Sequence, residues 1–158
     1  AGRTGVIHGA RLTSLNTYPG TPNVIQPGKR PRITLSPTLL FHDSKPIMAI
    51  SVAGGDQQDQ AALQIILNKV DFSMNAEAAY DTPRFATTHF VGSFGQGRAR
   101  LGSLTIPKTL PEEIESNLKA RNHVVTLGSG RVGGVALVDI DQNSGEVTGI
   151  GPAAAKVE

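Results

Sequence analysis

The paired glycines Gly54-Gly55 are the part of this sequence whose type and placement best suit chemistry. They follow an apolar run at 46–53 and precede a segment whose apolar residues recur at helical spacing. Without a Cβ, backbone N–H groups at such a junction come close to a substrate oxygen, and the start of a helix favours negative charge there. The chemistry predicted is stabilisation of an oxyanion by backbone amides. The alternative interpretation is a plain strand-to-helix turn.

Two polar residues near the pair have both a chemical and a structural interpretation. Asp56 is a good N-cap for the following helix, and its carboxylate is also a candidate for binding a substrate amine. Thr34 lies in an extended segment bounded by prolines, where its hydroxyl either contacts substrate or is satisfied internally. Arg84, between a proline and a phenylalanine, is expected to form an internal salt bridge.

Metal, cofactor and nucleic-acid chemistry are not indicated. The sequence has no Cys, and its four histidines show no metal-binding spacing. The glycine-rich stretch 95–102 lacks the preceding strand and following helix of a phosphate-binding loop. Lys29, Arg30 and Arg32 have no interleaved aromatics, and the net charge is only +2. We therefore expect no metal, no cofactor and no nucleic-acid partner.

The elements that must position these residues make up one domain, 1–158, with an aliphatic core. Strands are predicted at 4–8, 38–41, 46–53, 103–106, 124–127, 134–140 and 146–150, helices at 56–69, at 111–121 and from Asn75 to before Pro83, and a loop at 86–102. The run 46–53 is apolar on both parities apart from Ser51, which predicts a central strand covered on both faces. The fold class is therefore α+β, with helices layered on a mainly antiparallel sheet. The longest apolar run is far too short to span a membrane.

Residues 22–85 carry a series of short motifs in a fixed order. These are PGKRP at 27–31, SPT at 36–38, GG at 54–55, LNKVDFSMN at 67–75 and TPRF at 82–85. Order and spacing together resemble the small-subunit region of the γ-glutamyltransferase (γ-glutamyltranspeptidase) family. The stretch KARNHVV at 119–125 and the strands after it resemble the family's C-terminal end.

This resemblance implies an N-terminal-nucleophile hydrolase with an αββα sandwich, of which this chain would form part. The family precursor cuts itself, and the new N-terminal Thr attacks a γ-glutamyl amide such as that of glutathione, without a cofactor. Water or an amino acid then resolves the acyl-enzyme. By the same resemblance, Gly54 and Gly55 match the glycine pair of the family's oxyanion hole. Family members usually act in the periplasm or outside the cell, which suggests that location here.

Three departures from the family pattern point to its divergent, acylase-like branch. The serine pair that holds the substrate α-carboxylate in the family falls on Ile33 and Thr34, and only Thr34 keeps a hydroxyl. Asp56-Gln57 follows the glycine pair in place of Ser-Arg. The stretch 12–20 has no carboxylate, where the family has an acidic residue for the substrate α-amino group. The substrate is therefore either a γ-glutamyl amide or an amide of another acyl group.

Position 1 is Ala, which has no hydroxyl or thiol to act as an N-terminal nucleophile. We therefore expect the chain to be a C-terminal fragment of the small subunit and inactive alone, with the nucleophilic Thr and the large subunit elsewhere in its precursor. A sandwich without its partner subunit would expose apolar sheet surface, which predicts self-association. The alternative function is a non-catalytic ligand-binding or structural module on the same fold.

Overall fold

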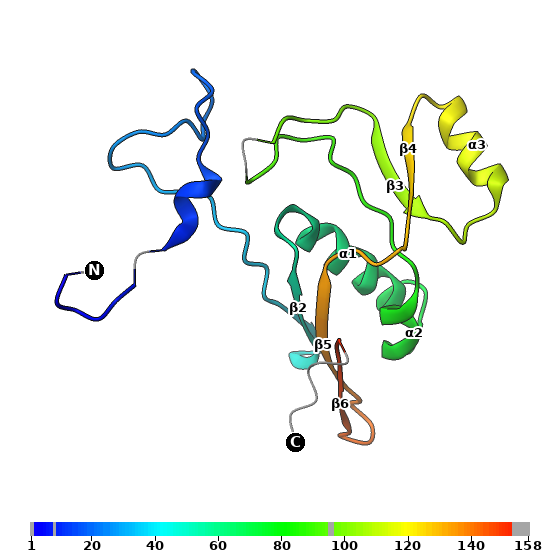
Figure 1. Ribbon diagram of the computed structural model, residues 1–158. Coiled ribbons are helices and arrows are strands. Elements are labelled where there is room, and N and C mark those ends of the chain that lie inside the picture. Colours follow the sequence, from blue (N-terminus) through cyan, green and yellow to red (C-terminus); the bar gives the residue numbers. More distant parts are fainter. Residues whose placement is uncertain (1, 8, 95–96, 153–158) are drawn as a thin grey trace.

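The computed structural model describes residues 2–7, 9–94 and 97–152, which form two connected parts (Figure 1). The larger part is a four-stranded antiparallel sheet in the order β1-β2-β5-β6, with α1 and α2 on one face. The smaller part contains β3, α3 and β4, and an irregular N-terminal segment lies to the side of both. The elements are η1 (Ala10–Ser14), β1 (Thr38–His42), β2 (Lys45–Ala53), η2 (Gly55–Gln57), α1 (Gln58–Val70), α2 (Ala76–Asp81), β3 (Ser103–Pro107), α3 (Glu112–Ala120), β4 (Val124–Gly128), β5 (Gly134–Ile140) and β6 (Val147–Ile150).

The core lies between the sheet and its two helices. Alternate residues of β2 point into it, so that Met48, Ile50 and Val52 are buried. Val135 and Leu137 of β5 lie opposite Val52 and Ile50 and extend the same surface. The helices present mainly alanine to this surface, which brings them close to the strands. The predicted hairpin, the central position of β2 and the long helix after it are therefore confirmed.

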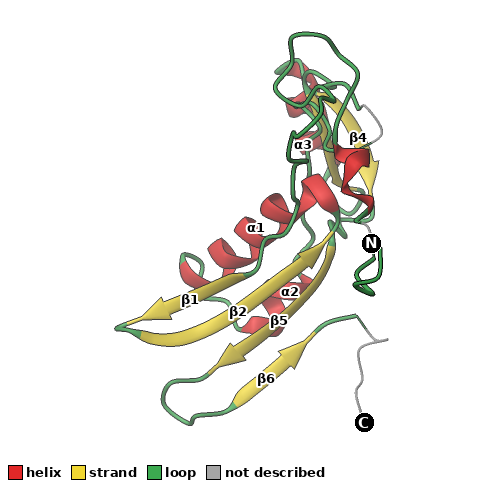
Figure 2. Cartoon of the chain, turned by 90° about the vertical axis from the view of Figure 1, so that its left-hand side faces the viewer, coloured by secondary structure: helices red, strands yellow, loops and turns green. Residues whose placement is uncertain are grey.

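The prediction that β2 is covered on both faces is wrong for the described residues. Helices cover one face, whereas the other face carries Leu39, Ala49 and Val138 around an apolar groove of about 600 Å³. In Figure 2 this open face is toward the viewer, with both helices on the far side. The sequence carries apolar side chains for two covered faces, but the described chain supplies the cover for only one.

The strands β3 and β4 pair in parallel and form a separate two-stranded sheet, which differs from the predicted single antiparallel arrangement. Their pairing runs from Ser103 opposite Val124 to Pro107 opposite Gly128. Helix α3 lies between the two strands in sequence, and a connection of this kind returns the chain in the same direction and so favours parallel pairing. Both strands were predicted correctly in position, but their partners were not.

The helices begin slightly later in the chain than predicted. The helix predicted from Asn75 begins at Ala76, and Asn75 caps it, because its side-chain oxygen accepts from the Ala78 N–H at 2.8 Å. Pro111 is the N-cap of α3 and not its first residue. Asp56 does not cap α1, which begins at Gln58. None of the described helices is long and apolar enough to cross a membrane.

The loop prediction for 86–102 is confirmed, apart from an isolated bridge between Ala86 and Thr105 and two residues that lie outside the described ranges. The predicted strand at 4–8 is wrong for its described residues, 4–7, which form no strand. Its last residue, His8, lies outside the described ranges.

The turn between β5 and β6 gives a prediction for the pH dependence of stability. Backbone N–H groups of Ser144 and Asn143 donate to the Asp141 carboxylate at 2.8 Å each, and they hold the pKa of Asp141 below its ordinary value. A lowered folded pKa means that this contribution is present above the unfolded pKa, about 4, and is lost as pH falls through the folded pKa. The difference in unfolding free energy between the native protein and an Asp141→Asn variant should therefore shrink below about pH 4. Urea unfolding across this range measures it, and a difference that did not change with pH would contradict the assignment.

Candidate active site

The glycine pair lies between the end of β2 and the start of the helical segment, as predicted, and both positions require glycine. Gly54 has φ +151° and Gly55 has φ +57°, both values that L side chains rarely adopt. A Cβ on Gly54 would come within 3.1 Å of the Gly133 Cα, and one on Gly55 within 3.1 Å of the Phe94 ring. The first N–H groups of a helix have no acceptor within it, so this junction is where backbone donors are left over.

Three of the four predicted site residues line one cavity of about 520 Å³. The cavity is bounded by the extended segment 32–35, by the start of the helical segment from Gly55 to Gln60, and by the loop segment 90–93. Thr34, Gly55 and Asp56 belong to this lining, and Gly54 is the residue immediately before it. The structure therefore brings together residues that are distant in sequence around the glycine pair.

The Asp56 carboxylate holds loop 90–93 in place instead of capping α1. Its Oδ2 accepts from the Ser93 backbone N–H at 2.7 Å, and its Oδ1 accepts from the Ser93 hydroxyl. Ser93 is only 2% exposed, so both of its donors depend on this carboxylate. Because Asp56 is occupied in this way, its carboxylate already has two donors before any substrate arrives.

Arg32 closes the same network from the opposite wall of the cavity. Its Nη1 donates to the Ser93 hydroxyl at 2.8 Å and to the Val91 carbonyl at 3.5 Å. With the Asn23 amide oriented to satisfy its neighbours, the oxygen accepts from Arg32 Nε at 3.1 Å and Nη2 at 2.9 Å. The Arg32 guanidinium is therefore hydrogen-bonded within the chain. We call Asp56, Ser93 and Arg32 the loop network.

Thr34 has a partner of its own within the chain. Its hydroxyl accepts from Arg11 Nη1 at 3.2 Å, and the Arg11 guanidinium also lies 5.8 Å from the centre of the Phe94 ring. The hydroxyl proton of Thr34 stays available for another acceptor, because this bond uses only the oxygen lone pair. Both interpretations of Thr34 therefore remain compatible with its geometry.

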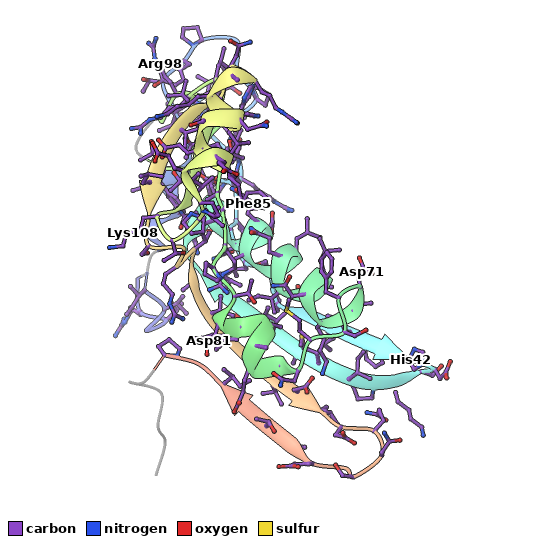
Figure 3. The ribbon with its side chains drawn as sticks, turned by 90° about the vertical axis from the view of Figure 1, so that its right-hand side faces the viewer. His42, Asp71, Asp81, Phe85, Arg98 and Lys108 are labelled. Atoms are coloured by element: carbon purple, nitrogen blue, oxygen red, sulfur yellow. The ribbon has the colours of Figure 1, made fainter. Side chains whose placement is uncertain are left out.

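Two glutamines of α1 have a role that the sequence reasoning missed. Gln60 accepts from the Thr87 N–H at 2.8 Å and donates to its carbonyl at 3.1 Å. Gln64 does the same with Phe85, at 3.0 and 2.9 Å. Phe85 lies near the junction of the two parts of the molecule (Figure 3). The sequence does hold a signal for this role. Two amide side chains stand four residues apart, on one face of the helix that follows the glycine pair.

The predicted salt bridge of Arg84 is wrong. Arg84 is buried and its Nη1 donates to the carbonyls of Tyr80 at 2.6 Å and Thr82 at 3.4 Å. The neighbouring carboxylate, Asp81 at the end of α2 (Figure 3), pairs instead with Arg131 at 3.6 Å. Burial lowers the pKa of Arg84, and the charge of Arg131 lowers it further. Arg84 therefore fixes the backbone that follows α2.

The sequence matches a family model described as Gamma-glutamyltranspeptidase over residues 1–154. The chain belongs to the gamma-glutamyltranspeptidase family. It is 30% identical to a glutathione hydrolase proenzyme of Bacillus subtilis subsp. natto over 92% of this chain and 23% of the relative. It is 27% identical to the acylase ACY 1 proenzyme of Pseudomonas sp. (strain SE83), over 92% of this chain and 24% of the relative. The chain thus spans about a quarter of the length of these relatives.

Solved structures of related proteins agree with this membership of the gamma-glutamyltranspeptidase family. The structure titled LmbA2991T421A is 34% identical and superposes with a TM-score of 0.77, over 90% of this chain and 26% of that one. An acivicin-inhibited gamma-glutamyltranspeptidase has a TM-score of 0.75 at 21% identity, over 99% of this chain and 85% of that one, which shows the fold. The predicted fold class, an α+β part of an N-terminal-nucleophile hydrolase sandwich, is confirmed.

Proposed function

We propose that the longer protein containing this chain is an N-terminal-nucleophile enzyme that cleaves an amide bond through an acyl-enzyme. The observation that most supports this is the cavity shared by Thr34, Gly55 and Asp56 beside an obligatory glycine pair, in a member of this family. Glutathione and other γ-glutamyl amides are candidate substrates because relatives are named glutathione hydrolases. Amides of other acyl groups are candidates because a relative is named an acylase.

In this proposal, a threonine upstream of Ala1 supplies the nucleophile. Its hydroxyl attacks the amide carbonyl, and the hydroxyl proton passes to the free α-amino group of the same threonine. The carbonyl oxygen becomes an oxyanion, which accepts hydrogen bonds from the N–H groups of Gly54 and Gly55. The C–N bond then breaks, and the amine leaves with the proton. Water or an amino acid attacks the resulting ester, which releases the acyl group and restores the threonine.

The open face of the sheet supports a second part of the proposal, which concerns partners. Its apolar groove around Leu39, Ala49 and Val138 is a surface that another layer of the sandwich would bury. We propose that the upstream part of the precursor, including its large subunit, supplies this layer. A second copy would take its place when the chain is alone. A periplasmic or extracellular location, suggested by the family resemblance, completes the proposal.

The deciding experiment combines the intact mass of the purified full-length protein with amine release from acyl p-nitroanilides. We expect two polypeptides, the smaller beginning at a Thr upstream of Ala1, together with release of p-nitroaniline. Changing that Thr to Ala should abolish both, and residues 1–158 alone should release no amine. A single uncut chain that binds amides without turnover would instead identify a non-catalytic binding module.

A further inference from the structure

The charged groups on the wall of the 520 Å³ cavity are already occupied or have the wrong sign for an anionic substrate. Arg32 is the one cation in the described lining, and its Nη1 donates to Ser93 while Nε and Nη2 face the Asn23 oxygen. The loop network therefore uses its guanidinium. A substrate carboxylate entering here would compete with these bonds or would find no other cation in the described lining.

Carboxylates make this wall still less suited to an anion. Asp56 is hydrogen-bonded to Ser93, and Asp59 is an exposed carboxylate that also belongs to the lining. Two acidic side chains beside the glycine pair raise the electrostatic cost of bringing a further negative charge into the cavity. The backbone amides proposed to stabilise the oxyanion would bind only the reacting carbonyl oxygen. They would therefore not offset the repulsion of a second carboxylate on the acyl group.

The rest of the lining includes four apolar side chains, those of Ile33, Leu35, Phe90 and Val91, together with polar ones. Ile33 and Leu35 both belong to the wall at 32–35, and they are 64% and 69% exposed. Val91 is 47% exposed across the cavity, and Phe90 is partly buried beside it. An apolar group entering the cavity would remove these side chains from water, which is the usual driving force for binding at such sites.

We propose that this site takes an uncharged, apolar acyl group in preference to one that carries a second carboxylate, such as a γ-glutamyl or glutaryl group. The inference rests on the proposed amide-cleaving function and specifies its substrate class. Ile33 is the residue that sets the preference, because it lies in the extended segment of the wall and is exposed to an entering group. Thr34 beside it provides one hydroxyl for orientation.

The test compares pentanoyl and glutaryl p-nitroanilides, which differ in a terminal methyl group or carboxylate, using the full-length protein. We expect kcat/KM to favour the pentanoyl substrate by about tenfold or more. An Ile33→Arg variant supplies an unoccupied cation and should raise kcat/KM for glutaryl and γ-glutamyl p-nitroanilides while lowering it for the pentanoyl substrate. The matched control is Val124→Arg, which adds the same charge at a residue that is 63% exposed and outside the cavity lining. This control should leave the ratio unchanged.

The outcomes distinguish a failure of the apolar acyl preference from a failure of the proposed amide cleavage. Faster turnover of the glutaryl or γ-glutamyl substrate by the native protein would overturn the apolar preference while leaving amide cleavage intact. Absence of turnover with all three substrates would count against the proposed function. In that case, calorimetry with the same substrates as ligands decides the preference, and tighter binding of the glutaryl amide would overturn it.

Discussion

A Gly133→Ala variant is expected to lose about 3 kcal/mol of unfolding free energy, because a left-handed backbone costs a non-glycine residue about 1–2 kcal/mol and overpacking adds about 1–3 kcal/mol. Gly133 has φ +69°, and an added Cβ would lie 2.5 Å from Val52 Cγ1 and 3.2 Å from the Ala53 carbonyl oxygen. Val52 belongs to the buried core, so it cannot move away without opening space elsewhere. Urea unfolding measures the loss.

Gly145→Ala is the control that separates the two causes. Gly145 has a similar φ of +76°, but no atom lies within 4 Å of the position of an added Cβ. This variant should lose only the conformational part, about 1 kcal/mol. Equal losses at the two positions would mean that crowding at Gly133 contributes nothing. Because Gly133 also abuts Gly54, we expect Gly133→Ala to disturb the candidate active site as well.

Removing the carboxylate of Asp56 is expected to release the loop that forms one wall of the cavity. An Asp56→Ala variant leaves the buried Ser93 N–H and hydroxyl without their acceptor, a loss of about 1–3 kcal/mol. Amide hydrogen exchange at Ser93 should become much faster, while exchange in the β2 core stays slow. Asp56→Asn keeps one acceptor oxygen and should fall between the variant and the native protein.

Asp59→Ala provides the matched control for this experiment. Asp59 lines the same cavity and carries the same charge, but it is exposed. Its removal should leave both the unfolding free energy and the exchange of the Ser93 amide close to native. If Asp59→Ala accelerated that exchange as much as Asp56→Ala, the effect would come from lost charge and not from the bonds to Ser93.

The sequence was sufficient for the features that depend on neighbours in the chain. The glycine pair, the short helix after Asn75 and the hairpin of β1 and β2 are local patterns, and each was predicted where it occurs. The family motifs then added that this α+β part belongs to a hydrolase sandwich. In each of these features, the residues that interact are close together in the sequence and are therefore also close together in the structure.

The features that sequence reasoning missed depend on residues that meet only after folding. Asp56 reads as a helix cap, yet its partner Ser93 lies 37 residues further along. Arg84 was predicted to form a salt bridge, but it donates to backbone carbonyls at the end of α2. The neighbouring carboxylate, Asp81, pairs with Arg131 instead. No periodicity distinguishes a carboxylate that caps from one that holds a distant loop.

The two-point hydrogen bonds of Gln60 and Gln64 reach only the backbone of Thr87 and Phe85. Recognition of main chain alone does not depend on which side chains the loop carries. The side chains of Phe90 and Val91 on the cavity wall take no part in this anchor and are therefore open to exchange, whereas Ser93 belongs to the loop network. When the anchoring hydrogen bonds stay the same and the cavity-lining side chains change, one scaffold can acquire new acyl specificities through a few loop substitutions. The core between the sheet and its helices would be little disturbed.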